Sequence, residues 1–422
     1  MRIQALLGLF VLLTACSDDA SEVETEDGTS SATSVGTTAP TTTSTTTSTT
    51  APPPATTGST TAVEPTATAG ESSTTTDEGD NSTGDVAVPG EPRLYVSGGN
   101  AVSVWSIDDA GALTELQRLD QGTTIGPLAT RDTRTIYAAR VQEQSVAALD
   151  LDPETGTLTE IAVTPVTHRP VYLTVDTTGQ WLMSAEFGGD LVRIYPLQDD
   201  GSVGETPSED RSVQSRPHAI LQDPSGDYVF VPHRDSNLVE QYVFDATTGT
   251  LTPNDPPSVA APDGAGPRHM VFAPDSSYAY VVNEFSSSVT AYAYDAATGL
   301  LTQGTTVSAL PPDFAGENTG ADIHITQDGA FVYASMRGLD ALATFAAGAD
   351  GSLGFLQSVE TQTRPREFGF GPFGRFVYAA GQDTGMLASY TLEDDGALTP
   401  GPLYDVGENP LWVLGIELPA AR

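Results

Sequence analysis

The residues best suited to chemistry stand near the two ends of one short stretch, GPRHMVFAPDSSYAYVVNE, at positions 266–284. Arg268 and His269 come close to its start, and Asn283 and Glu284 end it. A carboxylate or an imidazole can take a proton from water, and a guanidinium can stabilise an oxyanion or hold an acidic substituent. This combination suits hydrolysis of an activated ester such as a lactone. The same groups would also bind a sugar acid without reacting with it.

Several other chemistries lack the residues that they need. The sequence has no GxSxG elbow, no HExxH motif and no Cys/His cluster at zinc spacing. All 17 of its Lys and Arg residues are arginine, so no lysine can serve a phosphate-binding loop or a Schiff base. We therefore predict no metal and no cofactor.

The elements that must position these residues repeat along the chain. An anchor residue is followed eleven positions later by an aromatic residue, at Pro170 and Trp181, Pro217 and Tyr228, Pro267 and Tyr278, Gly320 and Phe331, and Pro365 and Phe376. A second pattern, glycine followed two residues later by Leu or Val, recurs seven times at spacings of 45 to 52 residues, at Gly111, Gly156, Gly201, Gly249, Gly299, Gly351 and Gly396. This spacing fits four short strands per unit.

Seven four-stranded units predict an all-β fold, a seven-bladed β-propeller over residues 91–422. We expect a composite closing blade in which residues 410–418 supply one strand and residues 93–114 supply the rest. Pairing the two ends of the domain in this way leaves no open sheet edge.

Strand order predicts which side chains meet. In each unit the innermost strand is antiparallel to the next, so the start of the first lies beside the end of the second. Residues 268–272 and 278–282 are the expected pair around our opening stretch. The same rule gathers all five histidines and eight arginines on one rim, with the residues Arg140, His168, Arg169, Glu186, Arg216, His218, His233, Arg234, Arg268, His269, Asn283, Glu284, Asp322, His324, Arg337, Arg364, Arg366 and Gln382.

A rim rich in arginine favours anion binding, because a guanidinium presents a planar fork of donors that matches carboxylate or phosphate. The alternative is that these arginines pair with Asp and Glu of neighbouring blades and only stabilise the fold.

Four segments resemble one known family, the propeller-type 6-phosphogluconolactonases, which also includes carboxymuconate-cyclising relatives. They are residues 264–284, residues 317–338 (ENTGADIHITQDGAFVYASMRG), residues 363–382 (TRPREFGFGPFGRFVYAAGQ) and residues 407–413 (GENPLWV). The resemblance covers residues 93–418. It implies a substrate cleft lined by the Pro-Arg-His, Asn-Glu, Arg-Gly and Pro-His motifs, which fall here on Arg268, His269, Asn283, Glu284, Arg337, Gly338, Pro217 and His218.

We expect Glu284 to act as the general base on water, with His269 orienting that water or serving as the alternative base. The expected substrate-binding residues are Arg268, Arg337, His218 and Asn283. The predicted function is hydrolysis of a sugar-acid lactone or another anionic lactone. The alternative is a non-catalytic propeller that binds an anionic sugar or a protein partner.

The chain departs from the family pattern on the same rim. Relatives usually have Ala-Asn-Tyr where this chain has Ala185-Glu186-Phe187, and Val-Pro-Asp-Leu-Gly where it has residues 231–235, Val-Pro-His-Arg-Asp. These departures leave the identity of the substrate open.

The N-terminal residues predict export and a lipid anchor. Arg2, the apolar run 5–13 and the sequence Leu-Thr-Ala-Cys ending at Cys16 resemble a bacterial lipoprotein signal, with residues 1–15 removed and Cys16 lipidated. The alternative is an ordinary secretory signal. Cys16 is the only cysteine, so disulfides are excluded.

Residues 16–90 form a predicted disordered linker, rich in Thr, Ser and Pro and acidic, because such a segment cannot bury enough apolar surface to fold. We expect an extracytoplasmic monomer that meets the membrane through its anchor only. A formal charge of −39 excludes nucleic acid as a partner.

Overall fold

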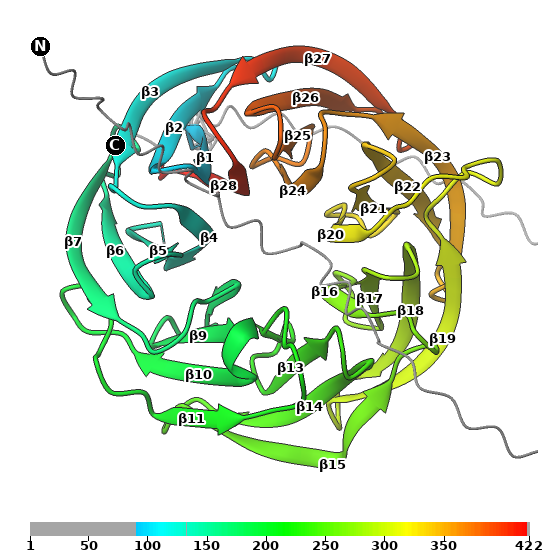
Figure 1. The fold of residues 1–422 in the computed structure, drawn as a ribbon, viewed down its shortest axis with the longest axis horizontal. Helices are drawn as coiled ribbons and strands as arrows, with labels where there is room; N and C mark the ends of the chain where they lie inside the picture. Colours follow the sequence, from blue (N-terminus) through cyan, green and yellow to red (C-terminus); the bar gives the residue numbers. More distant parts are fainter. Residues whose placement is uncertain (1–89, 132, 420–422) are drawn as a thin grey trace, which may run out of the picture. The chain divides into compact units, whose positions relative to one another are not determined.

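The computed structural model describes residues 90–131 and 133–419, and within them the chain forms a ring of seven four-stranded antiparallel sheets (Figure 1). The predictions for residues 1–15, Cys16 and nearly all of the linker lie outside the described residues. The described part holds one short 3-10 helix, η1 (Phe187–Gly189), and no helix long and apolar enough to cross a membrane.

We number the sheets as blades 1 to 7 and give the strands of each from the axis outward. Blade 1 is β28 (Pro410–Glu417), β1 (Pro92–Gly98), β2 (Ala101–Ile107) and β3 (Leu113–Asp120). Blade 2 is β4 (Ile125–Arg131), β5 (Thr135–Arg140), β6 (Ser145–Leu151) and β7 (Leu158–Pro165). Blade 3 is β8 (Tyr172–Val175), β9 (Trp181–Glu186), β10 (Leu191–Pro196) and β11 (Glu209–Ser212). Blade 4 is β12 (Leu221–Gln222), β13 (Tyr228–His233), β14 (Leu238–Asp245) and β15 (Thr250–Ala260).

Blade 5 is β16 (Pro267–Phe272), β17 (Tyr278–Asn283), β18 (Ser288–Asp295) and β19 (Leu300–Ser308). Blade 6 is β20 (Gly320–Ile325), β21 (Phe331–Met336), β22 (Ala341–Ala347) and β23 (Leu353–Glu360). Blade 7 is β24 (Pro365–Phe370), β25 (Phe376–Gly381), β26 (Met386–Leu392) and β27 (Leu398–Asp405).

The composite blade is confirmed. Strand β28, from the end of the chain, pairs antiparallel with β1 over six residues before the register shifts at Gly98. The ring is therefore closed by main-chain hydrogen bonds between the two ends of the domain.

The two sequence repeats meet in the core between blades. Gly299 and Gly351 have φ of +67° and +76°, a left-handed conformation that glycine adopts without strain, and a Cβ on either would overlap the ring of Tyr228 or Tyr278 in the preceding blade. The same contact recurs between Gly111 and Phe376, Gly249 and Trp181, and Gly396 and Phe331. Each aromatic residue thus packs on the glycine of the next blade, so both repeats are imposed by a single contact between blades.

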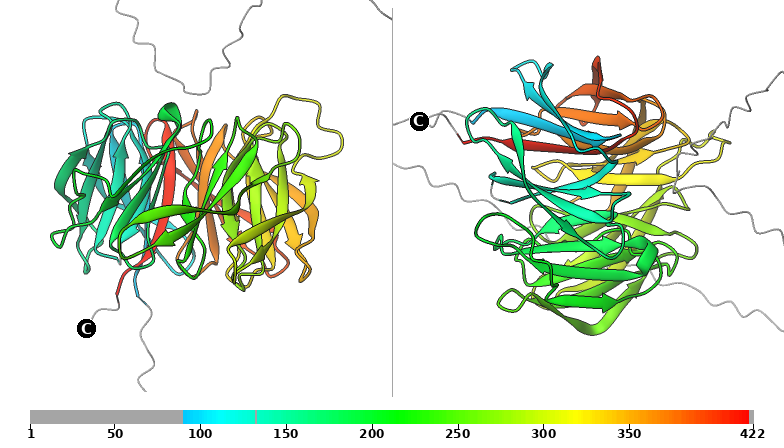
Figure 2. Two further views of the ribbon diagram at one scale, coloured as in Figure 1. Left: turned by 90° about the horizontal axis from the view of Figure 1, so that it is seen from below. Right: turned by 60° about the vertical axis from the view of Figure 1, so that its left-hand side comes forward.

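All innermost strands run from one rim of the ring to the other, and Figure 2 shows the strands spanning this thickness. We call the end where β16 begins the cation rim, because Arg234, Arg268 and Arg337 lie there, and the opposite end the turn rim. The prediction was wrong for His324, which is the fifth residue of β20 and pairs with Tyr333 near the start of β21, so it lies toward the turn rim. Gly90, the first described residue, lies at the turn rim, where Leu418 N donates a hydrogen bond to Glu91 O. The chain therefore enters and leaves the propeller on the side away from the cation rim.

Candidate functional site

A buried carboxylate, Glu284, gathers three guanidinium groups from three blades at the cation rim. Its Oε1 lies 3.1 Å from Nη1 of Arg234 and 3.3 Å from Nη2 of Arg337, and its Oε2 lies 3.3 Å from Nε of Arg268. We call these four residues the arginine cluster. Arg234 also lies 2.7 Å from Asp235, and Arg268 lies 3.7 Å from Glu367, so Glu284 is the acid that all three guanidinium groups share.

The position of Arg268 follows from a β-bulge. Pairing of β16 with β17 shifts between Pro267 and His269, so Arg268 is the extra residue of the bulge, a feature that often re-aims a side chain beside a functional site. The side chain is fully buried. Its Nη1 donates a 2.6 Å hydrogen bond to the carbonyl oxygen of Ala321 and lies 3.7 Å from Oε1 of Glu367.

One end of the Arg268 guanidinium is left without a hydrogen bond. Among the described residues, Nη2 of Arg268 has no hydrogen-bond partner although it is buried. Burial, together with the charges of Arg366 and Arg337, lowers the pKa of Arg268 to about 10, so the group remains a cation at neutral pH. A buried charged donor without an acceptor is costly, and an anionic oxygen of a ligand would satisfy it.

His269 lies next to this donor and is held by Asp322. Nδ1 of His269 lies 2.9 Å from Oδ1 of Asp322. Nη1 of Arg268 lies 3.2 Å from Nε2 and 3.5 Å from Nδ1 of His269, similar distances that place it over the ring face. Burial and the Arg268 charge lower the pKa of His269 to about 3. The neutral ring therefore donates its Nδ1 proton to Asp322 and keeps a lone pair on Nε2.

Asp322 connects His269 to a second histidine. Its Oδ2 lies 2.9 Å from Nε2 of His324 and accepts a 3.3 Å hydrogen bond from the backbone N–H of Phe368. Burial opposes the charge on Asp322, but His324 and the hydrogen bond from His269 outweigh it and hold the pKa of Asp322 well below its usual range. Burial likewise acts against protonation of His324, and the Asp322 charge outweighs it, raising the pKa of His324.

The central channel is crossed by a layer of side chains, each the second residue after the start of a blade's repeat. We call this the channel layer, and its members are Tyr172, His269, Asp322, Glu367 and Trp412. The ring of Tyr172 lies 5.1 Å from that of His269 and 5.3 Å from that of Trp412, centroid to centroid. Oε1 of Glu367 lies 4.0 Å from Nδ1 of His269. Burial and the neighbouring Asp322 raise the pKa of Glu367 well above its usual range.

A cavity of about 480 Å³ lies directly against the channel layer and runs along the innermost strands toward the turn rim. All seven innermost strands line it, and all five members of the channel layer form part of its wall. Its volume suits a small organic molecule. Arg268 and Glu284 are not among its lining residues, so the predicted site meets the cavity through His269, which lines it and contacts Arg268 of the arginine cluster.

His218 completes the group at the cation rim. Its ring makes edge-to-face contacts with Phe187 at 5.4 Å and with His269 at 5.3 Å. Burial and the Arg268 and His269 charges hold the pKa of His218 well below its usual range. Its Nδ1 is buried and makes no hydrogen bond to any described residue, so it is a second polar atom that a ligand could engage.

The structure therefore brings together five of the six predicted catalytic and substrate-binding residues: Glu284, His269, Arg268, Arg337 and His218. The sixth, Asn283, is buried at the end of β17, where its Nδ2 donates to the hydroxyls of Ser288 and Thr290 in β18 of its own blade. That amide joins two strands, and its role in substrate binding stays a prediction.

Other members of the predicted rim pair with acids of their own blade. His233 lies 3.1 Å from Glu240, and Arg193 pairs with the buried Glu186 inside blade 3. Arg140 lies 2.7 Å from Glu143. Pairing between neighbouring blades, which the alternative interpretation expected, occurs in the arginine cluster, and anion binding there stays a prediction.

Sequence reasoning missed Glu367, Tyr172 and Trp412. Each stands two residues after a repeat start, at Pro365, Pro170 and Pro410, as His269 stands after Pro267 and Asp322 after Gly320. Reading that one position across the repeats would have found the channel layer.

Comparison with known proteins places this arrangement in a family. The model of the family described as lactonase, 7-bladed beta-propeller, matches residues 93–414. The chain belongs to this family. The resemblance inferred from the four segments is thereby confirmed, and so is the predicted enzyme class, since this is a family of lactone hydrolases.

Named relatives agree with the family match. A 6-phosphogluconolactonase of Serratia proteamaculans is 33% identical over 315 residues, which cover 74% of this chain and 94% of the relative. One of Sodalis glossinidius is 34% identical over the same length. The solved structure of a periplasmic gluconolactonase of Pseudomonas aeruginosa superposes with a TM-score of 0.73 at 26% identity, covering 78% of this chain and all of that one.

Proposed function

We propose that this lactonase hydrolyses the lactone of a sugar acid that carries an anionic group, and that Arg268 holds that group or the oxyanion formed during ring opening. The observation that carries the proposal is the buried Nη2 of Arg268, a charged donor with no hydrogen-bond partner among the described residues. The convergence of three guanidinium groups supports an anionic ligand at the same place.

Geometry favours His269 over Glu284 as the group that takes the proton from water. Both oxygens of Glu284 lie within 3.3 Å of guanidinium nitrogens, so this carboxylate anchors the cations. His269 is neutral, is oriented by Asp322 through Nδ1, and keeps its lone pair on Nε2, which lies 3.2 Å from Nη1 of Arg268. This is the arrangement of a general base held by a carboxylate.

In the proposed reaction, water loses a proton to Nε2 of His269 while its oxygen attacks the lactone carbonyl. The tetrahedral oxyanion collapses, the ring C–O bond breaks, and the imidazolium returns its proton to the leaving alkoxide. The product is the open hydroxy acid. Asp322 stabilises the transient imidazolium through the Nδ1 hydrogen bond.

The test is turnover of a panel of sugar lactones, with and without a phosphate or carboxylate substituent, measured against the spontaneous rate in buffer. Asp322→Asn should lower kcat by about 100-fold or more, because the imidazolium loses its partner, with a smaller effect on KM. Turnover equal to buffer with every lactone would overturn the proposal and favour a propeller that only binds its ligand.

We further propose that the propeller acts outside the cytoplasm, attached by Cys16 to a bacterial membrane. The support is the sequence pattern ending at Cys16 and the likeness to the Pseudomonas aeruginosa gluconolactonase, which is a periplasmic protein.

A further inference from the structure

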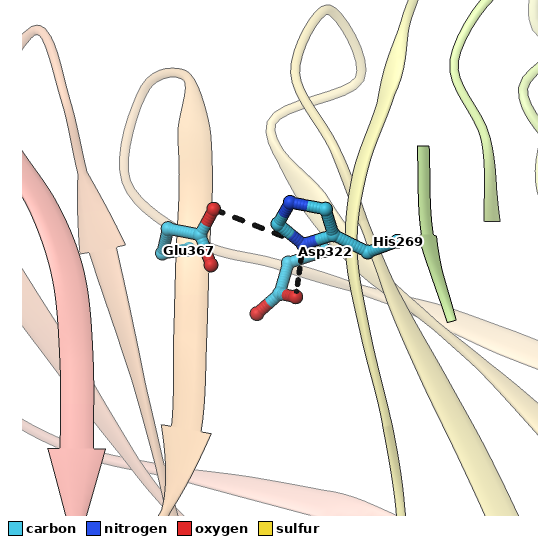
Figure 3. A group of neighbouring side chains, drawn as sticks. All are labelled: His269, Asp322 and Glu367. Carbon is cyan, nitrogen blue, oxygen red and sulfur yellow. Dashed lines mark hydrogen bonds and ion pairs between the residues drawn. The ribbon is translucent and has the colours of Figure 1, made fainter. Parts of the chain in front are cut away.

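Two carboxyl groups and an imidazole face one another in the channel layer. Figure 3 shows His269, Asp322 and Glu367 converging from β16, β20 and β24, and one ligand atom from each lies within 4.8 Å of the others. All three side chains are at least nine-tenths buried. Their groups are near neighbours in space although 98 residues separate the first from the last in sequence, 367 − 269.

Glu367 faces an acid as well as cations. The nitrogens that face it from blade 5, Nη1 of Arg268 and Nδ1 of His269, lie at 3.7 and 4.0 Å, which is beyond hydrogen-bond distance. The charge of Arg366 also acts on Glu367, and so does the carboxylate of Asp322, which is also an acceptor. Two facing acceptors are stable only with a proton or a cation between them.

We propose that His269, Asp322 and Glu367 form a binding site for one divalent metal ion. One imidazole nitrogen and two carboxylate oxygens form a mixed donor set that suits Mn²⁺ or Zn²⁺ better than Ca²⁺, which prefers oxygen ligands alone. Two negative charges and a neutral ring balance a divalent ion. The charge of Arg268, whose Nη1 lies 3.7 Å from Glu367, opposes the ion, but its Nε is paired with Glu284 on its other side.

The cavity supplies the route and the remaining ligands. Because all three residues line the 480 Å³ cavity, an ion can enter from the turn rim and complete its coordination with water. Three protein ligands and an open position are typical of sites that also bind substrate. A metal ion bound at Nδ1 takes the place of the proton that His269 donates to Asp322. The His269 imidazole can therefore either bind the metal or donate this hydrogen bond, but not both at once.

This inference does not depend on the proposed hydrolysis, and its test is a binding measurement. Mn²⁺ is titrated calorimetrically into the full chain in 0.15 M salt. The Debye length at this ionic strength is about 8 Å, so the attraction of Mn²⁺ to exposed carboxylates is screened. One site per chain is expected. Glu367→Gln and Asp322→Asn should each weaken it by about 100-fold or more, and the matched variant Asp275→Asn, at an exposed turn, should leave it unchanged.

Trp412 provides a readout that belongs to this site. Its ring centroid lies 6.1 Å from that of His269, close enough for bound Mn²⁺ to quench its fluorescence. Trp412→Phe should abolish the quenching and keep the calorimetric binding, which separates a local effect from misfolding. Equal Mn²⁺ affinity in the wild type and in a folded Glu367→Gln variant would overturn the proposal. A proton shared by the carboxyl groups of Asp322 and Glu367 would then explain their close approach.

Discussion

Replacing Glu284 by glutamine should destabilise the propeller as well as impair its chemistry. The substitution keeps the shape of the side chain and removes the one negative charge that faces Arg234, Arg268 and Arg337. At an effective dielectric constant of about 20, a pair of charges 3.3 Å apart interacts by about 5 kcal/mol before desolvation. Breaking a buried ion pair by removing one partner costs about 3–5 kcal/mol in measured cases, and we expect Glu284→Gln to fall in that range.

The assay is thermal unfolding of the wild type and three variants. At about 2 °C per kcal/mol for a domain of this size, Glu284→Gln should lower Tm by about 6–10 °C. Glu143→Gln is the matched control, because Glu143 pairs with Arg140 at 2.7 Å but is half exposed, and it should cost less than about 1 kcal/mol. The double variant Glu284→Gln/Arg234→Gln should regain part of the lost stability, since it also removes one of the three cations that the carboxylate had faced.

A Tm for Glu284→Gln within about 1 °C of the wild type would refute the view that this carboxylate anchors the cluster. The same measurement decides how loss of activity is interpreted. A variant without the carboxylate that three arginines share can disturb the anion site whether or not Glu284 takes a proton, so lower turnover alone does not identify a base.

Four further predictions follow from other parts of the chain. His218 is buried with its pKa well below the unfolded value, so its contribution to stability is present above about pH 6.5 and is lost as the pH falls. Between about pH 7.5 and 5.5 the free energy of unfolding of the wild type should fall by about 1.4 kcal/mol more than that of His218→Asn, as measured by denaturant unfolding. Arg268→Lys keeps the charge but removes Nη2, and should raise KM for an anionic lactone by about 10- to 100-fold relative to an uncharged one. Cys16→Ala should move the protein from the membrane fraction to the soluble fraction, and an unmodified Cys16 in the mass of the mature protein would contradict the anchor. A chain beginning at residue 104 lacks β1 and part of β2 and should be insoluble, whereas one beginning at residue 90 should melt with the mature protein; a folded monomer from the shorter chain would contradict closure through β28.

The fold was accessible from the sequence because one contact produces two patterns in it. In five of the seven blades an aromatic residue at the start of the second strand packs on a glycine of the next blade, so both positions are constrained in most repeats. The strand bounds expected for blade 5, residues 268–272 and 278–282, agree with β16 and β17 to within one residue at each end. Antiparallel pairing then places Arg268 near Glu284 without any knowledge of side-chain conformation.

The site was only partly accessible, because strand order within a blade says nothing about which blades face each other across the axis. Glu367 lies in blade 7 and meets His269 of blade 5, a contact set by the curvature of the ring and by the position of each residue along its strand. The β-bulge at Arg268 was equally hidden, since it depends on pairing that shifts by one residue. Asn283 shows the converse, because a residue on the correct rim can direct its amide into its own blade.

Closure of the ring and assembly of the channel layer are the same event. Trp412 belongs to β28, the strand that completes blade 1, and its ring packs on Tyr172 of blade 3, which in turn packs on His269 of blade 5. No single blade can hold Arg268, Asp322 and Glu367 in place, because each contacts groups from other blades. Buried charges at the axis would be unfavourable in any open form of the sheet array, so they favour the closed propeller over its alternatives. In this protein the residues proposed for catalysis thus depend for their positions on the hydrogen bonds between β28 and β1, which join the two ends of the domain.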